Sequence, residues 1–183
     1  MENSKTIYLI RHCEAEGQGP DAALTLKGKE QSIQLANLLK EKGIQLVISS
    51  TYRRAMESIR PLTVGLNISI LQDERLVERV LSPVSIENWQ FHLEESFADL
   101  DLILEGGESS IQAMNRGILA IQDYLNRLED TLAIMTHGNL LALLLKYYQA
   151  SIGYYEWKKL TNPDVFKLTI GKNQVLINRV WRN

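Results

Sequence analysis

Short apolar, β-branched runs alternate with amphipathic segments along this chain of 183 residues. Residues 6–10 have the composition of a buried strand, and residues 26–42 place Ile33, Leu35 and Leu38 at helical spacing between charges. Alternating strands and helices favour an open, mainly parallel sheet with helices on both faces. We therefore expect an α/β fold, a three-layer sandwich.

The remaining elements follow from the same patterns. Pro61 is expected to end or bend its helix, residues 83–104 are assigned a helix and loops, and Gly171-Lys172-Asn173 indicates a C-terminal β-hairpin. Further strands are predicted at residues 46–48, 68–71, 131–136, 165–170 and 174–181, and further helices at 52–64, from 108 or 109 to about 128, and at 137–148.

Length and composition favour one domain spanning residues 1–183. The net charge of -2 offers no basic footprint, so neither nucleic acid nor a membrane surface is an expected partner. Cys13 is the single cysteine, which fits a reducing compartment, and no signal peptide or membrane-length apolar run is found. A cytoplasmic protein is expected, and its oligomeric state stays open.

Charged and polar side chains follow three of the predicted strands. Arg11 and His12 come after the first, Arg54 lies one turn into the helix after the second, and His137 follows the strand at 131–136. Because parallel strands end at one edge of a sheet, these side chains should gather there, together with two helix N-termini. If each residue is considered separately, Arg54 is best interpreted as a solvated helix residue and His137 as a capping or core histidine. Their shared position favours an anion site, most simply for phosphate.

Six short blocks with known counterparts run through most of the chain. They are Arg11-His12-Cys13-Glu14, then Asp21 with Leu24-Thr25, Gly28 and Gln31, then Ser49-Ser50-Thr51-Tyr52-Arg53-Arg54-Ala55, then Leu76-Val77-Glu78, Gly107-Glu108-Ser109 and His137-Gly138. In these blocks and their order the chain resembles the histidine phosphatase superfamily, with its phosphoglycerate mutase-like fold. Each block alone is weak evidence for the superfamily, whereas the six blocks in this order are specific for it.

The resemblance implies a catalytic set. His12 would be the nucleophile that becomes phosphorylated, which a neutral imidazole can do near pH 7. Arg11, Arg54 and His137 would surround the phosphoryl oxygens and stabilise charge in the transition state. His137 would help most when protonated, which a nearby anion favours.

Other residues complete the implied site. Glu78 matches the general acid, with Glu74 as its nearest rival, and Gln18 and Gly138 are candidates for substrate contact. No metal or cofactor is expected, because the three histidines and scattered carboxylates lack ligand spacing.

Cys13 departs from the pattern, because the superfamily usually carries glycine there. A small, buried cysteine should be tolerated. A redox role beside the nucleophile is the sharper alternative, whereas a cysteine phosphatase is disfavoured because residues 14–21 contain no arginine to close a phosphate loop.

The expected function is a phosphatase acting on a small phosphorylated metabolite. Mutases of this kind carry a longer insertion, whereas only residues 79–107 lie between the Glu78 and Gly107 blocks here. The alternatives are a phosphoglycerate mutase-type phosphotransferase, a role on protein phosphohistidine, and a non-catalytic phosphate-binding or phosphoprotein-binding module. Substrate selectivity should lie in residues 82–104, which hold Trp89, Phe91, His92, Glu94 and Glu95, and the acidic side chains there should disfavour a highly charged substrate.

Overall fold

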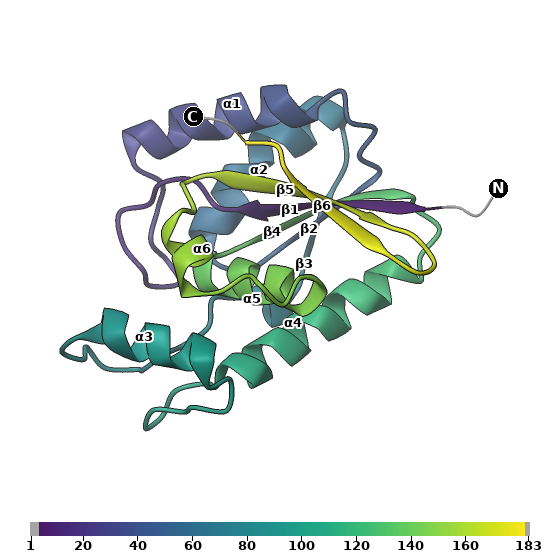
Figure 1. Ribbon diagram of the computed structural model, residues 1–183. Helices are drawn as coiled ribbons and strands as arrows, with labels where there is room; N and C mark the ends of the chain where they lie inside the picture. Colours follow the sequence, from purple (N-terminus) through teal and green to yellow (C-terminus); the bar gives the residue numbers. More distant parts are fainter. Residues whose placement is uncertain (1–3, 182–183) are drawn as a thin grey trace.

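A computed structural model describes residues 4–181 and contains one mixed sheet of six strands in the order β3-β2-β4-β1-β5-β6 (Figure 1). β1, β2, β3 and β4 run parallel to one another. β5 pairs antiparallel with both of its neighbours, β1 and the other hairpin strand, β6. The strands are β1 (Lys5–Arg11), β2 (Leu46–Ser49), β3 (Ile70–Gln72), β4 (Thr131–Thr136), β5 (Asp164–Ile170) and β6 (Val175–Arg179).

Helices cover both faces of this sheet, which confirms the three-layer α/β prediction (Figure 1). The helices are α1 (Leu26–Leu39), α2 (Arg53–Leu66), α3 (Trp89–Ala98), α4 (Ser110–Leu125), α5 (Gly138–Tyr148) and α6 (Tyr154–Lys158), with a short 3₁₀ helix at Glu74–Leu76. None of the helices in residues 4–181 is long and apolar enough to cross a bilayer.

Alternating strand residues divide the core in two. In β1, Ile7 and Leu9 belong to the core packed under α4 and α5, whereas Tyr8 and Ile10 belong to the core under α1 and α2. Both sets are buried because successive strand side chains point to opposite faces. This explains why residues 7–10 are continuously apolar.

The helix predicted at 52–64 is present as α2, which continues through Pro61 to Leu66. Its buried face, with Ile59 and Leu62, packs against the sheet and offsets the backbone hydrogen bond lost at Pro61. Other elements differ from the predicted ones. α4 ends at Leu125, before the predicted 128. α6 was not predicted, since five residues are too few to show a helical period.

Candidate active site

The ends of β1 and β4 bring two histidines together. Arg11 and Thr136 are partners in the parallel register, and the His12 amide donates to the Thr136 carbonyl at 3.1 Å. The residues that follow, His12 and His137, therefore lie side by side with their ring centroids 5.1 Å apart. The grouping predicted from three strand ends is present in the fold.

The hydrogen bonds of His12 define its tautomer. Its Nδ1 lies 2.6 Å from the Cys13 carbonyl oxygen, which can only accept, so Nδ1 carries the proton. Nε2 then holds the lone pair and accepts a hydrogen bond from Arg54 Nε at 3.1 Å. The nitrogen with the free lone pair is therefore Nε2.

Burial keeps His12 unprotonated. Its side chain is 6% exposed. Desolvation lowers its pKa to about 3, and the charges of Arg54 and Arg11 act in the same direction, against the bond to the Cys13 carbonyl. Since neutral imidazole is the nucleophilic form, His12 is in the reactive state at pH 7.

Arg54 is buried and anchored on several sides. Its Nη1 donates to the carbonyls of Gln18 and Gly19 at 3.0 and 2.7 Å. Its guanidinium lies 4.9 Å from the centre of the Tyr52 ring. The same tyrosine ring makes an edge contact with the ring of His137. Nη2 has no hydrogen-bond partner in the described part of the chain. One donor of this fixed cation is therefore left for an acceptor.

Arg11 lies over the start of α5. A Cβ added at Gly138 would lie 2.9 Å from Arg11 Nε, so the guanidinium uses the space that glycine leaves. Arg11 Nη1 donates to the carbonyls of Leu160 and Thr161 at 3.3 and 3.4 Å. Nε is buried without a partner among residues 4–181. Gly138 thus acts by admitting Arg11.

His137 is fully buried. One ring nitrogen, Nε2, is 2.7 Å from the Ser50 hydroxyl, and Nδ1 has no partner among the described residues. Desolvation lowers its pKa well below the usual value, and the charges of Arg54 and Arg11 act in the same direction. His137 is therefore neutral at pH 7 in this structure. The predicted protonation requires an anion to oppose these effects.

Glu78 caps α5. Its carboxylate accepts from the backbone amides of Asn139 and Leu140, each at 3.0 Å. These two amides of the α5 N-terminus are consequently occupied by Glu78. The capping contact orients Glu78 beside Gly138.

One cavity of about 760 Å³ contains the polar groups expected around a substrate. Arg11, Gln18, Glu78 and Gly138 all line it. Glu74 is exposed and does not line this cavity, which favours Glu78 as the acid. Gln18 reaches the cavity at an exposed position, and its backbone carbonyl also holds Arg54.

Cys13 is fully buried beside the nucleophile. Burial raises the pKa of its thiol to about 12, so the reactive thiolate is disfavoured. Its backbone amide donates to Ser58 Oγ at 2.9 Å. Its φ is not positive, since Asn67 and Asn88 are the non-glycine residues with positive φ within residues 4–181. The backbone therefore does not require glycine at this position.

Several supporting residues lack a sequence signal. Asn162 Nδ2 donates to the His12 carbonyl at 2.8 Å, across 150 positions of sequence. Ser50 and Tyr52 lie within a recognised block, but only the fold shows that both contact His137. The segment carrying Leu160 and Asn162 supports both Arg11 and His12.

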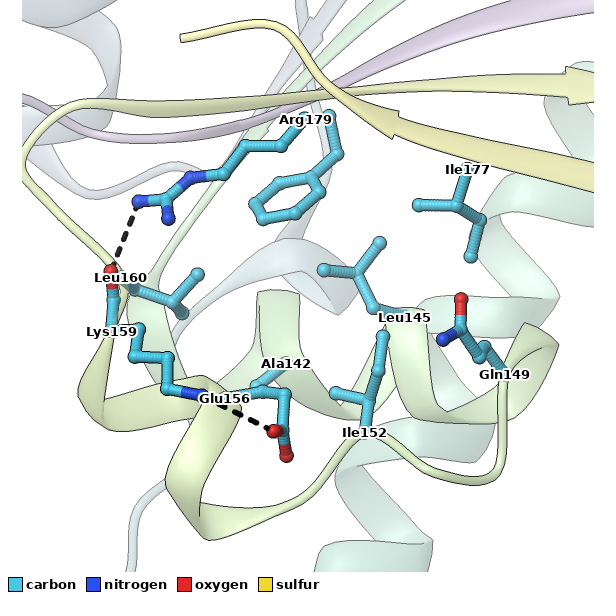
Figure 2. A pocket seen from close by; sticks show the side chains of 10 residues that line it. Ala142, Leu145, Gln149, Ile152, Glu156, Lys159, Leu160, Ile177 and Arg179 are labelled. Atoms are coloured by element: carbon cyan, nitrogen blue, oxygen red, sulfur yellow. Dashed lines mark hydrogen bonds and ion pairs between the residues drawn. The ribbon is translucent and has the colours of Figure 1, made fainter. Parts of the chain in front are cut away.

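A second cavity, of about 240 Å³, lies between α5, α6 and the β5–β6 hairpin (Figure 2). Leu145, Ile152 and Ile177 point into it, and the polar side chains at one side include Glu156 and Arg179. None of the predicted site residues lines it. The chemistry therefore belongs to the larger cavity.

The described residues contain no group of three or more His, Cys, Asp or Glu side chains placed to hold a metal ion. The cations around His12 are the guanidinium groups of Arg11 and Arg54.

Comparison with known proteins agrees with this geometry. The family model of the histidine phosphatase superfamily, branch 1, matches residues 7–182. The chain belongs to the histidine phosphatase superfamily. Since that match spans nearly the whole sequence, the resemblance found in the six blocks is confirmed.

Curated relatives within this superfamily include mutase-named proteins. A probable phosphoglycerate mutase GpmB from Escherichia fergusonii is 30% identical over 158 residues, covering 76% of this chain and 72% of the relative. The corresponding protein of Escherichia coli O1:K1 is 32% identical over 90 residues, which is 41% of its length.

Solved histidine phosphatase-like structures share the fold over nearly the whole chain. Bacillus stearothermophilus YhfR has a TM-score of 0.82 at 24% identity, covering 95% of each chain. A mycobacterial glucosyl-3-phosphoglycerate phosphatase has a TM-score of 0.77 at 18% identity, covering 96% of this chain and 98% of that one. At these identities the similarity establishes the fold.

Proposed function

We propose that this protein is a phosphatase that hydrolyses a small phosphomonoester through a phosphohistidine on His12. The observation that carries the proposal is the environment of Nε2. Its lone pair faces Arg54, while buried nitrogen atoms of Arg11, Arg54 and His137 have no partner among residues 4–181. A phosphoryl group at Nε2 would supply acceptors for all three, and buried polar groups strongly favour such partners.

The first step forms the N–P bond. Nε2 of His12 attacks phosphorus, the bond to the ester oxygen breaks, and Glu78 gives that oxygen a proton. The proton on Nδ1 stays hydrogen-bonded to the Cys13 carbonyl, which stabilises the positive phosphoimidazole. Arg11, Arg54 and His137 stabilise the charge on the three transferring oxygens.

The second step regenerates His12. Glu78, now a carboxylate, takes a proton from water, whose oxygen attacks phosphorus as the N–P bond breaks. Inorganic phosphate leaves, and Nε2 recovers its lone pair. Glu78 has the position for both transfers because it lines the same cavity as Arg11 while α5 amides orient it.

A mutase is the second candidate, because the 30% identical relative is named a probable phosphoglycerate mutase. Returning the phosphoryl group requires holding an acidic product in the site. Beyond Arg11, the charged lining of the cavity is limited to Glu78 and the buried Arg79 among the described residues. This lining supports hydrolysis over retention of a phosphoglycerate.

Hydrolysis of 4-nitrophenyl phosphate by the purified protein tests the proposal. We expect turnover by the wild type, loss of at least a thousandfold in His12→Ala, and wild-type activity in His92→Ala, whose histidine lies on α3 outside the cavity. Acid-labile phosphate on His12 should be trapped on rapid quenching. Retained turnover in His12→Ala would refute the assignment, and interconversion of 2- and 3-phosphoglycerate would support the mutase.

A further inference from the structure

The reaction cavity continues beyond the phosphate-binding groups towards α3 and α6. The wall of this extension is largely apolar, with Ser82 and Ser85 as its polar members, and includes Leu81, Val84, Ile86, Trp89, Leu93 and Trp157. At about 760 Å³ the cavity has the volume of a pocket for a drug-sized ligand, far more than a phosphoryl group needs. The extra volume belongs to the same cavity as Arg11 and Glu78, the proposed phosphate ligand and general acid.

Two tryptophans shape this wall from distant parts of the sequence. Trp89 begins α3 and Trp157 belongs to α6, and their rings meet at right angles with centroids 6.1 Å apart. Trp157 is held in place by stacking on the buried Tyr154, at 5.5 Å and an interplanar angle of 20°. A pre-positioned aromatic surface binds a ligand at little cost in side-chain entropy.

Trp89 is unusually open to solvent. Its side chain is 46% exposed, although tryptophan is normally well buried. An exposed aromatic residue bordering a cavity marks a surface for apolar ligands. Phe91, on the same helix, is 57% exposed but does not line this cavity. It therefore provides a matched control.

Few positive charges lie around the extension to bind an acidic leaving group. Arg79 is the charged residue of the lining besides Arg11 and Glu78 among the described residues. Two of its guanidinium nitrogens donate to the Glu108 carbonyl and to Ser96 Oγ, at 2.9 and 2.7 Å, which ties α3 to the chain before α4. The acidic Glu94 and Glu95 do not line the cavity, so selectivity against charge comes from the apolar wall instead.

We propose that the leaving group of the substrate is an apolar alcohol carrying an aromatic-sized group, which binds against Trp89 and Trp157. This inference rests on the proposed phosphatase function and specifies its substrate class. Burial of an aromatic ring on this wall removes apolar area from water, which accounts for the gain in affinity.

The test compares 2-phenylethyl phosphate with ethyl phosphate, since both release a primary alcohol and differ in the apolar ring. We expect the wild type to favour the phenylethyl ester at least tenfold in kcat/KM. Trp89→Ala should lower that ratio about threefold to tenfold, and Trp157→Ala similarly. Phe91→Ala should leave it unchanged. Trp89 is half exposed, so its replacement does not threaten the fold.

The outcomes separate the two proposals. Equal turnover of both esters, or an equal loss for both in Trp89→Ala, would overturn the apolar leaving group while the phosphatase assignment stands. Preference for 3-phosphoglycerate over the phenylethyl ester would also overturn it, in favour of an acidic substrate. Failure to hydrolyse the three esters would overturn this inference, and failure to hydrolyse 4-nitrophenyl phosphate as well would overturn the phosphatase function.

Discussion

The guanidinium of Arg11 occupies the space that a side chain at position 138 would need. In Gly138→Ala the new Cβ would lie 2.9 Å from Arg11 Nε, a flexible group that can move away. We expect an intact fold but a loss of about tenfold to a hundredfold in kcat/KM, because misplaced phosphate ligands weaken transition-state stabilisation. Steady-state kinetics and a thermal melt check this. Unchanged kcat/KM would show that Arg11 is not positioned through Gly138.

His12 also links folding to pH. Its folded pKa of about 3 lies below the unfolded value of about 6.5, so the unfolded chain binds more protons between these values. Stability should therefore fall as pH drops below about 6.5, by about 2 kcal/mol at pH 5 from this group alone. Burial lowers the pKa of His137 as well, so it adds to the loss.

Urea unfolding at pH 7 and pH 5 measures this effect. The midpoint of the wild type should drop on acidification, and His12→Gln should show a smaller drop because one titrating group is gone. His92→Ala should behave like the wild type, since that partly exposed side chain lies on α3 outside the cavity. An identical drop in His12→Gln and the wild type would contradict the assigned protonation state.

At the scale of elements, α1 is held close to the loop after β1. A Cβ at Gly28 would lie 2.0 Å from the Glu14 carbonyl oxygen, a backbone atom that cannot yield easily. Gly28→Ala should therefore destabilise the protein by about 2 kcal/mol. Gly65→Ala in α2, where nothing lies within 4 Å, should be neutral or stabilising by up to about 1 kcal/mol. Denaturant midpoints of both variants compare them directly.

Elements with long or clean periods were predictable from sequence. The strand at 131–136 matches β4 to the residue, and the helix at 137–148 differs from α5 by its first residue. α6 was missed because it is short, whereas the helix predicted at 52–64 continues through Pro61 because packing of the α2 face outweighs a local penalty. A hydrophobic period can be detected where one face of an element is buried over several turns. A short element has too few positions for such a period to be detected.

The candidate site was likewise predictable in part from the sequence. The strand ends and the six blocks predicted which side chains meet, since topology alone brings Arg11, Arg54 and His137 to one edge. The bond from Glu78 to the α5 amides and the contact of Asn162 with His12 were not predictable. Both depend on how loops distant in sequence pack, for which a single sequence has no periodic signal.

At the scale of the whole molecule, one sheet connects β3 at one edge to β6 at the other, and α3 lies outside its two helical layers (Figure 1). The predicted single domain requires this outlying segment to unfold with the sheet. Arg79 favours that coupling, because it is buried and donates to Ser96 of α3. Ser110 of α4 also donates to the Ser96 carbonyl, at 2.6 Å.

Two probes of urea unfolding test this coupling. Far-UV circular dichroism follows all helices and strands, whereas tryptophan fluorescence is weighted towards α3 and α6 through Trp89 and Trp157. Coincident transitions are expected for one cooperative unit. An earlier fluorescence transition would show that α3 opens separately from the sheet. In that case the aromatic wall would be a mobile cover over His12, and the single-domain prediction for residues 1–183 would be wrong.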